Sequence, residues 1–575
     1  MIDHSTKAQV IETEQVEVED ADGAIRCFEL SSGDGAVKVR LCSLGASITN
    51  FFVKNPTGTS NEYDDIVLGY DSVASMRASK NPCYFGAIVG RVANRIKNAR
   101  FDLNGRTYDL EANNPPNHLH GGSGGFSHRI WNVERTGVID NYSHAIPFVC
   151  FSLDSLDGDQ GYPASVRVTA LYSLRPALFA GGSTLCVDIK AELLQGSSLS
   201  TPINLAQHSY FNLAPFPDRA NGILDHALLL ESDAYTPIDS FSIPTRQVRS
   251  LQQDPSMSFA SKPRQMKAAI QDYGVSVLNY PAEQVQSDLG HRMPDTPYGI
   301  DHNYVVRQQP FAAIPKVATL SYNTTTLEVH STAPGVQVYT GNYLGEGDEH
   351  APWNHKELYK RWSGVCLETQ HFPDSIAKSS SDLGSSEFAK GRCPILSSQQ
   401  REYRHTVEYT VYHANDTTNV GSDTEGRYFD SVESMWLEQS LSTWYRRSKA
   451  YYEDNCPSTV DGVLGNLGWL SKDDIEGSRK FLDQLGIDSV LQDGLACECG
   501  AGIGRVTKGL LLDVCKRCDV VESSSRLLSA APDYIGRESH RCRFFCSELQ
   551  DWLPQASKYG EFLCIQGKIP ISYFS

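Results

Sequence analysis

Short runs of alternating apolar and polar residues, separated by turn residues, dominate the chain from about Val16 to Tyr412. Two examples are VKVRLCSLGASITNFFV, which begins at Val37, and VEYTVYHA, which begins at Val407. A side-chain period of two is typical of strands with one buried face, whereas segments of helical period are scarce here. We therefore predict one large antiparallel β-sandwich over residues 16–412.

The pattern changes after a polar segment, NDTTNVGSDTEGR, that begins at Asn415. Its composition predicts a linker over residues 413–427. The remainder, 428–575, contains helical spacing, with Ser471 as a predicted helix N-cap. It also contains GLACECGAGIGRVTKG, which is typical of a strand, a glycine-rich turn and a helix. This order predicts a second, smaller α/β domain of Rossmann type.

Bulk properties exclude several classes of protein. The formal net charge of -18 argues against nucleic acid as a partner. The N-terminus has no signal-like segment, and no stretch approaches the ~20 apolar residues of a membrane span. The 15 cysteines are scattered without a repeated spacing, which favours reduced thiols and a cytoplasmic location.

Six segments of the predicted sandwich place charged, amide or imidazole side chains among apolar residues. They are FGAIVGRVANRI (with Arg91, Asn94 and Arg95), NHLHGG (His118 and His120), TPINLAQHSYFNLA (His208), YGIDHNYVV (Asp301 and His302), PGVQVYTGNYL (Gln337) and GVCLETQHFPDS (Glu368). A carboxylate and a histidine are a natural acid–base pair near neutral pH. Several fixed polar side chains suit a neutral, polyhydroxylated ligand.

These six segments, in this order, resemble the aldose 1-epimerase (galactose mutarotase) family. The resemblance implies a β-supersandwich with its site in an open cleft. It implies interconversion of the α and β anomers of a free aldohexose, glucose or galactose, without a cofactor. Glu368 would be the general base on the anomeric hydroxyl, and His208 the general acid on the ring oxygen.

The same resemblance assigns the substrate-binding residues. His120 would assist His208 and orient the ring, and Asn94 and Arg95 would hold hydroxyls. Asp301 would hold hydroxyls on the opposite side, and Gln337 would line the cleft. No metal is predicted, because the histidines lack a zinc-ligand spacing such as HExxH.

Other interpretations stay open at this point. Glu368 is alternatively an ion-pair partner of an arginine such as Arg95, and Arg91 is interpreted as an ion-pair donor that holds the fold. The polar stretch from Arg249 to Pro297 predicts an expanded loop. A non-catalytic carbohydrate-binding module and a phosphosugar epimerase are the rival functions, together with a role for the second domain.

The second domain resembles the α-N-terminal protein methyltransferases over about residues 440–566. That resemblance implies S-adenosylmethionine as cofactor and protein N-termini as partners, and makes a bifunctional protein an alternative function. Gly500, Arg505, Glu522, Leu549 and Gln550 would contact the cofactor, and Gln566 the substrate amine. Because the chain stops after GKIPISYFS, we expect a truncated, weakly active or inactive methyltransferase, or a gene model that ends in non-coding sequence.

Overall fold

The computed structural model describes most of residues 8–413 and a smaller part of the rest. In the first stretch it leaves out 18–23, 56–62, 142–143, 178–181, 195–198, 216–217, 261, 279–298, 308, 310–313, 346–352, 355–356 and 377–384. After residue 413 it describes 421–422, 428–429, 457–460, 471–472, 475–476, 479, 495–499 and 501–547. The predicted linker over 413–427 lies almost wholly outside the described residues.

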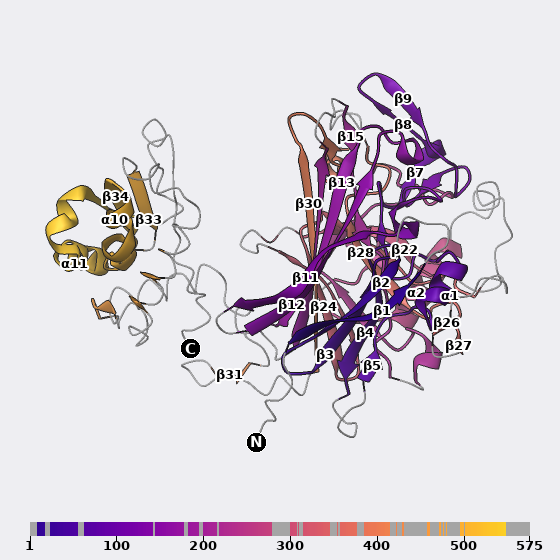
Figure 1. Ribbon diagram of the computed structural model, residues 1–575, viewed down its shortest axis with the longest axis horizontal. Coiled ribbons are helices and arrows are strands. Elements are labelled where there is room, and N and C mark those ends of the chain that lie inside the picture. Colours follow the sequence, from indigo (N-terminus) through magenta and orange to yellow (C-terminus); the bar gives the residue numbers. More distant parts are fainter. Residues whose placement is uncertain are drawn as a thin grey trace. The chain divides into compact units, whose positions relative to one another are not determined.

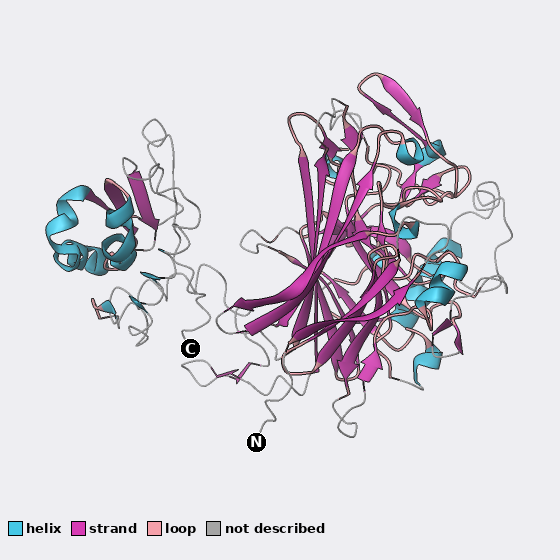
Figure 2. Cartoon of the chain, viewed as in Figure 1, coloured by secondary structure: helices cyan, strands magenta, loops and turns pink. Residues whose placement is uncertain are grey.

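The chain divides into two compact units, Met1–Thr418 and Asn419–Ser575. In Figure 2 the described part of the first unit is mostly strand, with a few short helices. The domain limits that the sequence predicts, at residues 412 and 428, stay predictions. No helix in the described ranges is both long and apolar enough to cross a membrane.

Two sheets of the first unit are wholly antiparallel (Figure 1). The five-stranded sheet follows chain order: β1 Gln9–Val16, β2 Ile25–Ser31, β3 Val37–Cys42, β4 Ser47–Lys54 and β5 Tyr63–Asp65. The nine-stranded sheet has the order β11 Asn132–Asn141, β12 His144–Ser155, β13 Val166–Pro176, β14 Ser183–Leu193, β30 Glu402–His413, β24 Thr325–Ser331, β23 Lys316–Tyr322, β18 Ala227–Leu230 and β21 Arg264–Gln265.

A third, six-stranded antiparallel sheet carries most of the predicted site residues. Its order is β17 Tyr210–Phe211, β28 Val365–Gln370, β25 Gly335–Tyr339, β22 Asp301–Val306, β19 Ser232–Tyr235 and β20 Arg249–Ser250. Short antiparallel pairs complete the unit: β6 Ile88–Val89 with β16 Ala206–Gln207, β7 Arg95–Ile96 with β10 His118–Leu119, β8 Arg100–Leu103 with β9 Arg106–Asp109, β15 Thr201–Pro202 with β29 Ile395–Leu396, and β26 Trp353–Asn354 with β27 Glu357–Leu358. Among the described residues of this unit, the α-helices are α1 Val73–Ala78, α2 Met266–Leu278 and α4 Ser386–Ala389, beside a few short 3-10 turns.

One apolar core joins the three sheets. It contains Phe28 and Phe51 from the five-stranded sheet, Val168 from the nine-stranded sheet, and Val338 and Leu367 from the six-stranded sheet, all less than 5% exposed. Alternation along each strand sends every second side chain into this core. The predicted antiparallel sandwich is therefore confirmed.

The stretch from Arg249 is more regular than the sequence indicated. Its described part forms β20, β21 and the 13-residue helix α2. The prediction of an expanded loop is wrong for residues 249–278, because Met266, Ala269 and Ile270 of α2 pack into the interior and stabilise the helix. Residues 279–298 lie outside the described part.

The second unit contains three parallel strands, β33 Leu495–Cys499, β34 Arg517–Glu522 and β35 Cys542–Cys546. A glycine-containing turn at 501–504 follows β33 and leads into helical turns that end in α10 Leu512–Val514, and α11 Ser525–Ile535 follows β34. The α/β prediction is confirmed. Ser471 is itself helical, so its prediction as an N-cap is wrong.

Arg91 holds the sandwich by hydrogen bonds to oxygen atoms rather than by the ion pair that the sequence analysis expected. It is 2% exposed. Its Nη1 donates to the carbonyl oxygens of Pro163 and Ala164 at 2.7 and 2.8 Å, and its Nη2 donates to that of Ser155 at 3.0 Å. No carboxylate lies within ion-pair distance of Arg91 in the described part of the chain.

Replacement of Arg91 is therefore expected to destabilise the first unit strongly. Arg91→Met removes a charged donor and leaves buried carbonyl oxygens without partners, which costs about 3–5 kcal/mol. Arg167→Met is the control, because Arg167 pairs with Asp154 at the surface and should contribute less than about 1 kcal/mol. Urea unfolding of the full chain measures both. Equal, small effects of the two substitutions would contradict this role for Arg91.

Candidate active site

Strand pairing in the six-stranded sheet aligns the predicted site residues. Gln337 on β25 lies directly opposite Glu368 on β28. On the other side of β28, Tyr210 of β17 lies opposite Cys366. His208 comes two residues before Tyr210, and therefore reaches the position beside Glu368, two residues after Cys366.

Alternation along β28 explains why Glu368 points away from the core. Val365 and Leu367 belong to the apolar core, whereas Cys366 and Glu368 occupy the opposite face of the same strand. All six residues of β28 are buried. The site therefore rests on a rigid, fully packed strand, which fixes the position of the Glu368 carboxylate.

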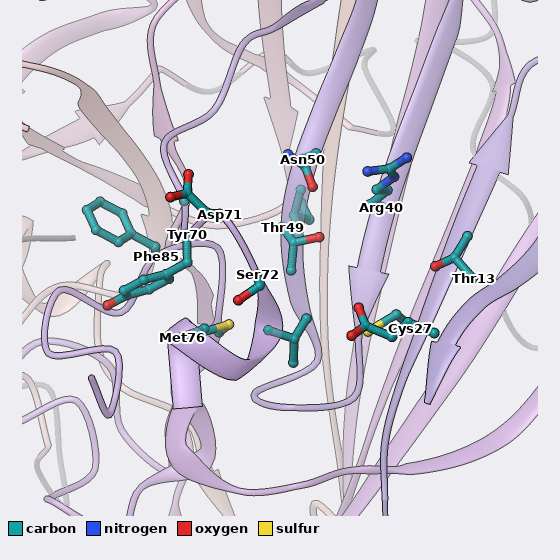
Figure 3. Close-up of a pocket in the computed structure, with 14 residues that line it drawn as sticks. Thr13, Cys27, Arg40, Thr49, Asn50, Tyr70, Asp71, Ser72, Met76 and Phe85 are labelled. Carbon is teal, nitrogen blue, oxygen red and sulfur yellow. The ribbon is translucent and has the colours of Figure 1, made fainter. Parts of the chain in front are cut away.

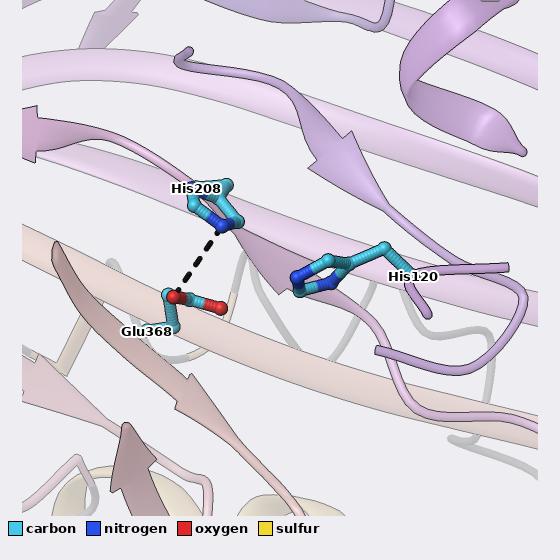
Figure 4. Close-up of side chains that lie close together, drawn as sticks. All are labelled: His120, His208 and Glu368. Atoms are coloured by element: carbon cyan, nitrogen blue, oxygen red, sulfur yellow. Dashed lines mark ion pairs between the residues drawn. The ribbon is translucent and has the colours of Figure 1, made fainter. Parts of the chain in front are cut away.

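His120, His208 and Glu368 meet at one point (Figure 4). His208 Nε2 lies 3.4 Å from Glu368 Oε1. One ligand-type atom from each of the three residues lies within 4.8 Å of the others. The three residues are 6, 3 and 2% exposed, so they are almost enclosed, whereas the resemblance implied an open cleft.

The backbone of Asn94 fixes the proton on His120. The Asn94 N–H donates to His120 Nδ1 at 3.2 Å. Since a neutral imidazole carries one proton, that proton must lie on Nε2. His120 is therefore a hydrogen-bond donor through Nε2, and this tautomer opposes metal binding there, although the three residue types are those of a metal site.

Burial shifts the pKa values of the pair in opposite directions. Desolvation, with a contribution from Asp301, raises the pKa of Glu368 to about 8, although Arg95 partly lowers it. Desolvation lowers the pKa of His208 to about 4. Burial also lowers the pKa of His120 well below its ordinary value. At neutral pH the pair therefore holds a single proton.

The remaining predicted sugar ligands lie beside the pair. Asp301 accepts a hydrogen bond from Gln337 Nε2 at 2.6 Å, and Arg95 Nη1 lies 3.5 Å from the other Asp301 oxygen. The side chains of Arg95 and Asp301 are 15 and 19% exposed, which makes them the more accessible part of the group. The interpretation of Glu368 as an ion-pair partner of Arg95 is wrong, since Arg95 pairs with Asp301 and Glu368 with His208.

Two buried acceptor atoms at the site lack a partner in the part of the chain that the structure describes. They are Glu368 Oε2 and Gln337 Oε1, from facing positions on adjacent strands. A buried acceptor without a hydrogen bond costs about 1–3 kcal/mol. Such a cost is typical of functional sites, where the ligand supplies the donor.

Sequence reasoning missed two side chains around His208. The ring of Tyr84 lies 4.7 Å from that of His120 and 5.6 Å from that of His208, measured between centroids. Cys366 Sγ lies 3.7 Å from His208 Nδ1. Nothing in the sequence around Tyr84 indicates this position, whereas Cys366 follows from the strand period, two residues before Glu368.

A separate cavity of about 270 Å³ lies between the five-stranded sheet and α1 (Figure 3). Its lining includes Arg40, Asn50, Tyr70 and Phe85. None of the predicted site residues lines it. It is therefore distinct from the acid–base group.

In the second unit, Glu522 lies at the end of β34 beside the glycine-containing turn. Its carboxylate accepts hydrogen bonds from the backbone N–H groups of Gly502 and Ser524, both at 2.8 Å. Arg505 donates to Ser471 Oγ at 3.3 Å. The other predicted contacts, Gly500, Leu549, Gln550 and Gln566, lie outside the described residues.

Comparisons with known proteins cover both units. Residues 26–391 match the family described as aldose 1-epimerase. The chain is 34% identical to the galactose mutarotase of Bos taurus over 386 residues, 67% of this chain and 93% of that protein. It is 33% identical to the galactose mutarotase of Homo sapiens over 395 residues, 68% of this chain and 95% of that protein.

Solved structures agree on the fold of the first unit. A GalM/aldose epimerase homologue from C. elegans superimposes with a TM-score of 0.51 at 22% identity, over 66% of this chain and 96% of that chain. Galactose 1-epimerase from Lactobacillus acidophilus gives 0.52 at 20% identity, over 71 and 99%. Residues 440–568 match the family described as AdoMet dependent proline di-methyltransferase, so the second unit is methyltransferase-like.

Proposed function

The chain belongs to the aldose 1-epimerase family, and from that membership we propose that its first unit interconverts the α and β anomers of a free aldohexose, glucose or galactose. The observation that carries the proposal is the enclosed pair of Glu368 and His208, with Nε2 and Oε1 3.4 Å apart. A binding module without catalysis has no need of a buried carboxylate whose pKa is raised to about 8.

The proposed reaction needs two proton transfers. Glu368 takes the proton of the anomeric hydroxyl, and the O–H electron pair becomes the second bond of the aldehyde. The bond between C1 and the ring oxygen breaks towards that oxygen, which receives the proton of His208. The aldehyde turns about the C1–C2 bond, and the two residues then return the protons in reverse to close the other anomer.

The proton count of the pair stays constant throughout this cycle. Before ring opening the proton is on His208 and Glu368 is ionised, whereas afterwards Glu368 is protonated and His208 is neutral. Both states contain one proton, which is the count that the two shifted pKa values favour at neutral pH. Those values place that proton on Glu368, so ring opening starts from the less populated arrangement of the pair. No cofactor is required by this scheme.

The neighbouring residues support a neutral sugar. Arg95 is the positive charge next to the pair, and Asp301 neutralises it. A phosphosugar would require a phosphate to compete with Asp301 for Arg95. We therefore assign Arg95, Asp301, Asn94, Gln337 and His120 to hydroxyl binding and ring orientation, and a free hexose as the substrate.

Polarimetry of α-glucose and α-galactose with the full chain tests this proposal. Glu368→Gln and His208→Asn should each lower kcat by about 10²–10⁴-fold, because each removes one positioned proton-transfer group. Glu387→Gln is the control, since Glu387 forms an exposed pair with Lys390, and it should leave the rate unchanged. Sugar binding without acceleration by the unmodified chain would leave only the binding module.

We further propose that the second unit binds S-adenosylmethionine. The supporting observation is Glu522, which is 8% exposed at the end of β34. Its carboxylate accepts two backbone hydrogen bonds and one from Ser523 Oγ at 3.3 Å, out of roughly four acceptor positions. Two ribose hydroxyls would take the remaining position and replace the Ser523 contact. The bound cofactor would supply an activated methyl group, and Glu522 with the adjoining turn would hold it.

Titration calorimetry of the full chain with S-adenosylhomocysteine tests this second proposal. Binding is expected for the unmodified chain and should weaken at least about 10-fold in Glu522→Ala, which removes the acceptor of two ribose hydroxyls. Glu538→Ala is the control, because Glu538 pairs with Arg541 away from the turn. Absence of binding by the unmodified chain would contradict the assignment, whatever its methyl-transfer activity.

A further inference from the structure

Each ring nitrogen of His208 is met by a different side chain of β28. Nε2 faces Glu368 Oε1 at 3.4 Å, and Nδ1 faces Cys366 Sγ at 3.7 Å. Cys366 and Glu368 are two residues apart on the same face of the strand, and they are 0 and 2% exposed. The imidazole therefore lies between two neighbouring side chains on one face of β28, with the Cys366 thiol at Nδ1 and the Glu368 carboxylate at Nε2.

The partner of Nδ1 must serve two protonation states if His208 moves a proton through Nε2. When His208 is charged, Nδ1 carries a proton and needs an acceptor. When Nε2 has given its proton away, the remaining proton of the neutral ring stays on Nδ1, so Nδ1 needs an acceptor in both states. A carboxylate at this position would stabilise the charged ring and raise the pKa of His208, whereas a neutral thiol accepts only weakly and leaves the ring free to lose its Nε2 proton.

The surroundings keep Cys366 in its thiol form. Burial raises the pKa of Cys366 well above its ordinary value, and the charge of Glu368 adds to this. The sulfur therefore carries its proton at neutral pH, offers its lone pairs as a weak acceptor, and adds no charge next to His208.

We propose that Cys366 is a positioning residue, whose sulfur accepts from His208 Nδ1–H in both charge states of the ring and so holds Nε2 at Glu368. The inference rests on the proposed function, in which His208 is the acid. Other titratable groups that face His208 in the described structure are Tyr210 from its own segment, Tyr84 and His120 from the loops above it, and Glu368.

Three substitutions in the full chain test this inference by mutarotation kinetics. Cys366→Ala removes the partner of Nδ1 and should lower kcat about 10-fold with little change in KM, a part of what a positioned acid contributes. Cys366→Ser restores a partner that donates and accepts, and should keep kcat within about 3-fold of the unmodified chain. Because a hydroxyl is the stronger acceptor for Nδ1–H, the serine variant should also shift the acid limb of the pH profile to higher pH.

Cys42→Ala is the matched control. Cys42 is also 0% exposed and belongs to the same apolar cluster as Cys366, but its thiol donates to the carbonyl of Leu44 at 3.4 Å. It should leave kcat and the pH profile unmoved. An equal loss in the two alanine variants, or an unchanged pH profile in Cys366→Ser, would overturn the inference and leave Cys366 a packing residue.

A spectroscopic measurement separates this inference from the proposed function. The ¹⁵N signal of His208 Nδ1, assigned by its loss in His208→Asn, should differ between the unmodified chain and Cys366→Ala in the absence of sugar. If the unmodified chain fails to accelerate mutarotation, the proposed function fails while this contact is still tested. An identical Nδ1 signal in the two proteins would overturn the role of Cys366.

Discussion

The arrangement of the site depends on the antiparallel register of four strands. β17, β28, β25 and β22 bring His208, Glu368, Gln337 and Asp301 to one face of a sheet, although these residues are as much as 160 positions apart in the chain. A shift of one residue in any pairing would send that strand's site residue into the apolar core. Packing of the opposite face, with Val338 and Leu367, therefore fixes the geometry of the candidate site as well as the fold.

Burial sets the proton chemistry of the pair. A carboxylate and an imidazole that are both enclosed are most stable when together they hold one proton, because the pair then has no net charge. Residues in the loops next to the pair also affect where its protons lie. Asn94 and His120, which both adopt positive φ values of 65 and 50°, form the hydrogen bond that fixes the His120 proton on Nε2. Asp301 and Arg95 shift the pKa of Glu368 in opposite directions.

The sequence alone was enough for the sandwich and for the α/β order of the second unit, because strand period is a local signal. It also singled out Glu368 and His208, which the structure brings together, although their roles as base and acid come from the family resemblance and stay predictions. The hydrogen-bond and ion-pair partners of individual side chains could not be predicted from the sequence. Arg91 binds carbonyl oxygens contributed by a loop more than 60 residues away, and Arg95 pairs with Asp301 rather than Glu368. The sequence did not predict helix α2, because tertiary packing of Met266 and Ile270, rather than a clear periodic pattern, stabilises it. The place of Tyr84 depends on loop geometry, which leaves no pattern in the sequence.

The central claim is that a single proton, shared between Glu368 and His208, is the working state of the site. The pH dependence of kcat/KM for α-glucose, measured by polarimetry from pH 3 to 9.5 after subtraction of the buffer rate, tests it most directly. Below a pKa of about 4 the pair gains a second proton and lacks a base, and above about 8 it loses its proton and lacks an acid. The account predicts a bell with limbs near these two values and its maximum midway between them. A rate that stays constant or rises through pH 8 and beyond would contradict it.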